Sequence, residues 1–151
     1  MGDIQLTAAE CVERLMKEME EELENVQSLT GKMAAKGSKR AYNRMRRRHR
    51  KEWRKLIRQD RPWDYEYIFD MLATKLRHMC EYYSQCHNVY VNEKDRAEII
   101  HILEAMVGAL IHRNDCYFAD ELDQNEAELC CDVSIKYALA LLSKYYYYLW
   151  D

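Results

Sequence analysis

Histidine and cysteine side chains, the common ligands of zinc, gather between residues 78 and 87. The group consists of His78, Cys80, Cys86 and His87. On a helix, His78 and Cys80 would point about 200° apart, so they could not hold one ion together. Structural zinc sites usually contain a Cys-x-x-Cys pair, which this chain lacks. We therefore predict no metal site and no cofactor.

Nucleophilic catalysis would require a thiol with a base held beside it. Cys86 and His87 are adjacent in sequence, but no third group is visible that would orient the imidazole. His101 and His112 could not form a metal site either, because on one helix they would lie about three turns apart. The glycine motifs of nucleotide-binding sites are absent from the sequence. We predict that the chain is not an enzyme.

The six cysteines are expected to be reduced thiols that pack as small hydrophobic side chains. Most of them fall inside helical patterns, and the first residues lack the basic start and apolar run of a signal peptide. No stretch approaches the roughly 18 apolar residues of a membrane span. We expect a cytoplasmic location. The cysteines are Cys11, Cys80, Cys86, Cys116, Cys130 and Cys131.

Positive charge is concentrated in one segment. Residues 32–61 contain fourteen Lys or Arg and only two acidic residues, Glu52 and Asp60, whereas residues 1–31 have eight acids and two bases. The whole chain has a net charge of −3, so this average hides a strongly dipolar arrangement. We expect the segment to bind an anionic partner through Arg40, Arg44, Arg46, Arg47, Arg48, Arg50, Lys51, Arg54, Lys55 and Arg58.

The basic segment is also periodic. Its apolar and aromatic residues recur at helical spacing on one narrow stripe, which leaves the arginines on the other faces. A flexible arm would not need such a stripe, so we predict a helix over residues 38–59 that docks on the domain. The stripe consists of Tyr42, Met45, His49, Trp53, Leu56 and Ile57.

The remaining elements are also expected to be helices. Thr7 and Glu10 have the spacing of a capping box at the start of an acidic helix running to about residue 30. Pro62 ends the basic helix, because proline cannot continue it. After it, apolar residues recur at helical spacing in three more segments, one of which begins near Asn92, and each predicts a helix. With one Pro and four Gly, the chain has little turn chemistry, which favours long helices.

We predict one all-α domain over residues 1–151, a bundle of four to five helices with an acidic N-terminal helix followed by the Arg-rich amphipathic helix. Residues 1–59 would form a charge-segregated helical hairpin across a hinge at residues 31–37, and residues 60–151 a three-helix core. Whether the acidic helix neutralises the basic one stays open at this point. Residues 145–148 are four consecutive tyrosines that must point in different directions, so at least one should be exposed.

Two segments resemble small uncharacterised accessory proteins of bacteriophages. The first is Pro62-Trp63-Asp64-Tyr65-Glu66-Tyr67, followed by Lys75-Leu76, Met79 and Tyr82-Tyr83. The second is the end of the chain, Leu141-Leu142-Ser143-Lys144 to Leu149-Trp150-Asp151, where those proteins often finish in Trp-Trp-Asp. The resemblance covers about residues 60–151 and carries over no functional residue. It implies a phage-encoded accessory protein acting inside a bacterial host cell.

Within that context the leading hypothesis is a non-enzymatic inhibitor or modulator. It would bind a host protein that handles nucleic acid, for example a CRISPR or other defence nuclease, through the Arg-rich helix. Tyr146, Tyr147 and Trp150 are possible aromatic contacts. The alternative is direct binding of RNA or DNA by the same arginines, and a third possibility is a structural or assembly protein of the phage. We expect no membrane partner, and a homo-oligomer is compatible with the exposed tyrosines.

Overall fold

The computed structural model describes residues 7–25, 39–85, 93–119 and 122–149. These residues form five α-helices and a final 3-10 helix. The elements are α1 (Ala8–Asn25), α2 (Lys39–Ile57), α3 (Tyr67–Gln85), α4 (Glu93–Tyr117), α5 (Gln124–Tyr145) and η3 (Tyr146–Leu149). The predicted all-α bundle is confirmed. The predicted helix over residues 38–59 differs from α2 by one residue at its start and two at its end.

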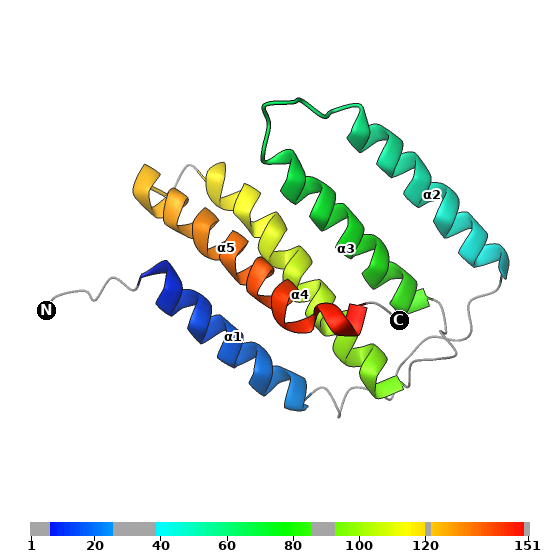
Figure 1. Cartoon of the computed structure of the whole chain (residues 1–151), viewed down its shortest axis with the longest axis horizontal. Helices are drawn as coiled ribbons and strands as arrows, with labels where there is room; N and C mark the ends of the chain where they lie inside the picture. The colour runs from blue at the N-terminus through cyan, green and yellow to red at the C-terminus, as the bar shows by residue number, and fades with distance from the viewer. Residues whose placement is uncertain (1–6, 26–38, 86–92, 120–121, 150–151) are drawn as a thin grey trace, which may run out of the picture.

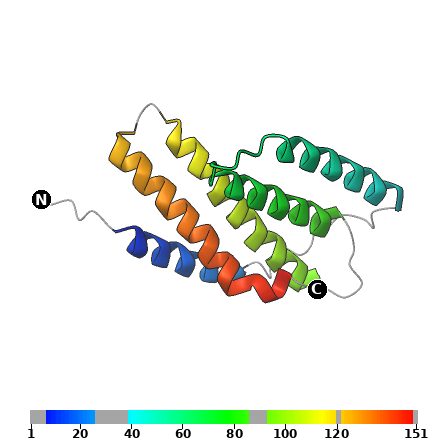
Figure 2. The ribbon, with the colours of Figure 1, turned by 45° about the horizontal axis from the view of Figure 1, so that its top comes forward.

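The helices lie side by side, with α4 and α5 at the centre (Figure 1). On one side, α1 packs against α5, and on the other, α3 packs against α4 and carries α2 on its outer side. The two outermost helices are therefore α1 and α2, at opposite edges of the bundle, and the second view shows the same separation (Figure 2). Only α3 packs substantially against α2.

This arrangement corrects the predicted hairpin over residues 1–59. The acidic and basic helices follow each other in sequence but do not pack together, because each lays its apolar stripe on a different helix of the core. Met19 of α1 is 3% exposed against the core that also contains Leu103 of α4 and Leu141 of α5. Burial of this side chain outweighs the attraction between two exposed, oppositely charged surfaces, which is weak in water.

Hydrogen bonds of the capping-box type fix two helix starts. The predicted box at Thr7 is confirmed, since the Thr7 backbone N–H donates to Glu10 Oε2 at 2.7 Å and the Glu10 N–H to Thr7 Oγ1 at 3.4 Å. The sequence analysis missed the second one. Asp123 Oδ1 accepts from the Glu126 N–H at 2.9 Å, and the Asp123 N–H donates to Glu126 Oε2 at 3.2 Å. This capping box begins α5.

The core is built around α4. Leu103, Met106 and Leu110 of this helix have at most 2% of their surface exposed, and α3, α5 and α1 contribute Leu76, Leu141 and Met19.

None of the described helices combines the length and apolar composition needed to cross a membrane. The predicted hinge at residues 31–37 and the predicted helix start at Asn92 lie outside the described residues.

Candidate nucleic-acid interface

The basic helix α2 docks on α3 through a narrow inner face. Met45 is its one buried residue, at 3% exposure, and Trp53 and Leu56 on the same stripe are half-buried. Beyond Met45, the contact is largely aromatic and polar. A hollow of about 260 Å³ remains between the two helices, lined by Arg46 and Lys75 among others.

Two histidines and two glutamates form the polar part of this contact. The His49 and His78 rings stack with centroids 3.7 Å apart and planes 7° from parallel. The His49 Nε2–H donates to Glu81 at 2.7 Å, and the His78 Nε2–H donates to Glu52 at 2.6 Å. Each helix therefore supplies one histidine and one glutamate to its neighbour. We call these four residues the His–Glu network.

The stacked arrangement favours neutral imidazole at His49. Burial lowers the pKa of His49 to about 4, with a further contribution from the positive charge that His78 can carry. The pKa of Glu52 is lowered chiefly by its hydrogen bond with His78. Arginines surround the network, since Arg48 pairs with Glu81 and Arg77 approaches Glu52 at 3.1 Å. Docking of α2 is therefore sensitive to protonation below neutral pH.

The outer face of α2 carries a continuous row of cations. Six of the ten predicted contact residues follow one another at steps of four, three, four, three and four along the chain, which places them on one side of a helix. All six are exposed, and no ion pair joins any of them to another described residue. We call them the cationic stripe: Arg40, Arg44, Arg47, Lys51, Arg54 and Arg58.

The other four predicted residues occupy different positions. Arg48 is bound to Glu81 and lies 4.0 Å from Glu52, so it belongs to the docking contact. Arg46 lines the hollow against α3. Arg50 and Lys55 are exposed and flank the cationic stripe on either side. The predicted set is therefore divided between a docking side and an outward side.

Glutamates of α1 do not cover the stripe. Two of them pair with the central helices instead, Glu22 with His101 of α4 at 2.9 Å and Glu20 with Lys144 of α5. Because α1 and α2 are at opposite edges, the alternative in which the acidic helix neutralises the basic one is wrong. The charge segregation of the sequence is retained as a spatial segregation.

The predicted aromatic contacts lie apart from the stripe. Tyr146 and Tyr147 are 39% and 72% exposed on η3, which packs on α5, and Trp150 lies outside the described residues. In Figure 2, η3 lies at the edge of the bundle opposite α2. The expectation that at least one of the four tyrosines is exposed is confirmed, but these rings do not extend the basic surface.

Other exposed apolar residues adjoin the cationic stripe. The sequence analysis did not identify three of them as a surface group, and it wrongly placed the fourth, Ile57, on the docked stripe: Ile57 is the last residue of α2 and is 62% exposed, because it lies at the turn into α3. All four line a shared cleft where the chain turns from α2 into α3, and their exposed fractions lie between 58% and 78%. They are Ile57, Trp63, Tyr65 and Ile68. The available signal was two aromatic residues beside Pro62, in a break between two apolar stripes, where no helix could bury them.

Residues considered for metal binding in the sequence analysis are dispersed. His78 belongs to the His–Glu network, and the Cys80 thiol points toward Glu104, with Sγ 3.9 Å from the carboxylate. Burial raises the pKa of Cys80, which disfavours the thiolate. Cys86 and His87 lie outside the described residues.

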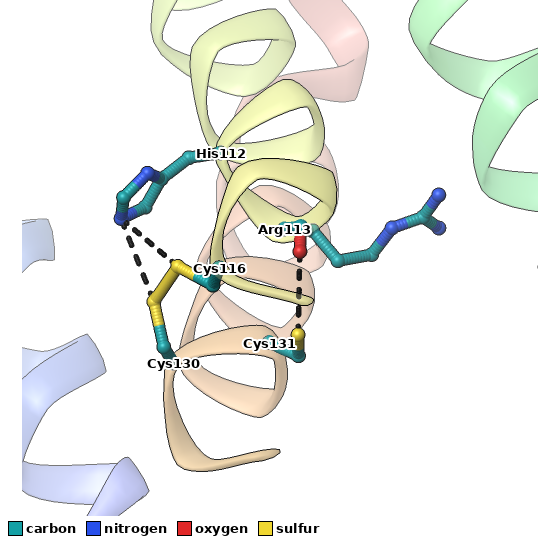
Figure 3. Close-up of a disulfide and its surroundings, with 5 residues drawn as sticks. All are labelled: His112, Arg113, Cys116, Cys130 and Cys131. Atoms are coloured by element: carbon teal, nitrogen blue, oxygen red, sulfur yellow. Dashed lines mark hydrogen bonds between the residues drawn. A yellow bond between two sulfur atoms is a disulfide. The ribbon is translucent and has the colours of Figure 1, made fainter. Parts of the chain in front are cut away.

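A different group comes together where α4 ends and α5 begins (Figure 3). His112 Nε2 lies 3.4 Å from Cys116 Sγ and 3.5 Å from Cys130 Sγ. Cys116 and Cys130 form a disulfide, which corrects the prediction of reduced thiols for these two. Cys11, Cys80 and Cys131 are free and half-buried. The i, i+4 spacing of His112 and Cys116 was visible in the sequence, but the approach of Cys130 depends on how α5 packs.

No protein family matches this chain, and neither a curated protein nor a solved structure is similar to it.

Proposed function

We propose that this protein binds nucleic acid through the cationic stripe of α2 and does not act as an enzyme. The observation that carries the proposal is the row of exposed cations on a helix at the edge of the bundle, with no acidic partner among the described residues. Five of the six cations are arginines, and each guanidinium can present a planar pair of donors to phosphate oxygens.

The spacing of the stripe suits a phosphodiester backbone. From Arg40 to Arg54 the helix rises about 21 Å, and over that length one strand of a duplex carries about six phosphates. The stripe offers five cations over the same distance. The net negative charge of the rest of the chain would oppose binding, but the acidic α1 faces away from the stripe at the other edge of the bundle.

Charge reversal at the centre of the stripe tests the proposal. In the first variant, Arg47, Lys51 and Arg54 become Glu. In the matched control, the exposed residues Arg14, Lys17 and Lys136 become Glu, which gives the same net charge away from α2. Binding is measured by fluorescence anisotropy with labelled single-stranded RNA, single-stranded DNA and duplex DNA.

We expect the stripe variant to lose more than about a hundredfold in affinity, roughly 3 kcal/mol, because three attractions become repulsions. The control should retain affinity within about threefold, since its charges lie beyond about one Debye length from the bound strand. Equal losses in the two variants would indicate a dependence on net charge alone and would contradict the proposal.

The second candidate function is the inhibitor or modulator of a bacterial host protein that handles nucleic acid. The exposed group of Ile57, Trp63, Tyr65 and Ile68 favours it, because contiguous apolar and aromatic surface beside a charged helix is typical of protein interfaces. The same two aromatic rings could also stack on unpaired bases.

Trp63→Ala separates these possibilities. If the ring stacks on bases, the variant weakens binding of single strands and leaves duplex binding unchanged. If the ring contacts a protein, no nucleic-acid affinity changes, while capture of a host protein from nuclease-treated bacterial lysate is lost. A duplex affinity that falls as much as the single-strand affinity would show that the substitution disturbs α2 itself.

A further inference from the structure

Three side chains at the junction of α4 and α5 have the chemistry of a soft-metal site. His112 and Cys116 are four residues apart and therefore share one face of α4, and Cys130 faces them from the first part of α5 (Figure 3). One nitrogen and two sulfur atoms lie within 4.8 Å of one another. Imidazole together with two thiolates is a ligand set that zinc prefers.

The distances from the imidazole to the two sulfurs fit tetrahedral coordination. Zinc bonds of about 2.0–2.1 Å to nitrogen and about 2.3 Å to sulfur place N and S about 3.5 Å apart at the tetrahedral angle. The observed separations of His112 Nε2 from the two Sγ atoms are 3.4 and 3.5 Å. Only the bonded sulfurs would have to move apart, and reduction of the disulfide permits this.

A fourth coordination position has space available. His112 and Cys130 line a cavity of about 570 Å³ between α1, α4 and α5. Its other lining residues are mainly apolar, but they include Cys11 and Glu126, each with an atom that could ligate a metal. Three protein ligands beside an accessible cavity leave room for water or a fourth side chain.

We propose that, when Cys116 and Cys130 are reduced, they and His112 bind one Zn²⁺, and that the disulfide is the metal-free state of the same site. Binding converts two thiols and one neutral imidazole into a site with two thiolates and releases two protons. In the reverse direction, a small-molecule disulfide such as oxidised glutathione accepts two electrons from the two thiolates. The protein disulfide forms, two small-molecule thiolates leave, and Zn²⁺ is released.

The site is distinct from the proposed nucleic-acid interface. It joins α4 and α5, whereas the cationic stripe lies on α2 at the edge of the bundle beyond α3. The inference does not rest on the proposed function, and either can fail without the other.

The test uses the full chain, reduced and kept without oxygen, and titrated with Zn²⁺ and with Co²⁺. We expect about one metal ion per chain and about two protons released, measured by calorimetry in buffers of different ionisation enthalpy. The cobalt form should show thiolate-to-cobalt charge transfer and the intense visible bands of tetrahedral cobalt. Addition of oxidised glutathione should release the zinc to a chromophoric indicator.

The variants are Cys130→Ser and His112→Gln, with Cys80→Ser as the matched control, because Cys80 is a free thiol on α3 outside the site. Removal of a residue that only hydrogen-bonds to a metal ligand already weakens metal binding about 10–100-fold. Removal of a ligand itself should therefore weaken zinc binding by more than about a hundredfold. His112 is exposed, so its variant should fold normally. If the reduced protein binds zinc no more tightly than Cys130→Ser, the disulfide is structural only and the proposal is overturned.

Discussion

The helices α4 and α2 are held in the molecule in opposite ways. The central helix α4 places Leu103, Met106 and Leu110 against three neighbouring helices, with almost no exposed surface at these side chains. The edge helix α2 buries only Met45 and completes its contact with the His–Glu network. Since α2 uses little of its surface for docking, most of it stays available for cations. Apolar packing therefore maintains the fold, and a polar contact presents the candidate interface.

Leu103→Ala should give the largest loss of stability. The side chain is fully buried at the centre of the bundle, so its truncation leaves a cavity and should lower the free energy of unfolding by about 2–5 kcal/mol. Urea denaturation followed by circular dichroism measures this. A loss below about 1 kcal/mol would mean that α4 is not the centre of the core.

Met45→Ala should act on α2 and leave the rest of the bundle intact. Because α2 packs mainly on α3, its undocking limits the cost, and we expect about 2 kcal/mol of local stability to be lost. Amide hydrogen exchange should become about thirtyfold faster across residues 39–57, with exchange in α4 unchanged. Equal acceleration in both helices would show that α2 is part of the cooperative core.

Acidification should release α2 before it affects the core. The His49 pKa is about 4 in the docked state, below its ordinary value of 6.5, so its contribution is complete above pH 6.5 and falls as the pH drops toward 4. The groups facing His49 are His78 and the glutamates of the network, together with two arginines, Arg48 and Arg77.

Fluorescence of Trp53, which lies edge-on to His78 at 5.8 Å, reports the docking. The measurement uses a chain in which the other two tryptophans, Trp63 and Trp150, are replaced by Phe. In that background, His49→Gln should remove most of the change between pH 6.5 and 4. If the variant titrates as the parent does, another group controls the contact.

Gly108→Ala should have the smallest effect, and the opposite sign. The residue lies in the middle of α4, and an added Cβ would meet no other atom within 4 Å. Alanine has a higher helix propensity by about 1 kcal/mol, so we expect a rise in melting temperature of about 2–4 °C. A fall would show that the space beside Gly108 is filled in solution.

The sequence predicted where each helix lies along the chain better than it predicted which helices pack together. The apolar stripe around Met45 and Trp53 correctly indicated a docked, ordered helix with arginines outside. The sequence analysis also placed the acidic helix beside the basic one, in a hairpin across a hinge, and this placement was wrong. Charge attraction across water has little orientational preference, whereas the buried Met19 fixes α1 on the other side of the core.

The candidate sites show the same limit. The cationic stripe could be predicted, because its spacing along one helix determines its geometry. The group of His112, Cys116 and Cys130 could be predicted only in part, since Cys130 approaches through the packing of a second helix. Tyr146 and Tyr147, which were predicted as aromatic contacts, are exposed but lie away from the stripe. Trp63 and Tyr65, which were not predicted, adjoin it.

The salt dependence of nucleic-acid affinity tests the central claim most directly. If six cations of the stripe neutralise phosphates, a plot of log Kd against log salt concentration should rise with a slope of about 4 for single strands and about 5 for duplex DNA. Replacement of Arg47, Lys51 and Arg54 by Gln should reduce the slope by about 2–3. An unchanged slope in that variant, or no binding even at about 50 mM salt, would contradict the assignment of α2 as the interface.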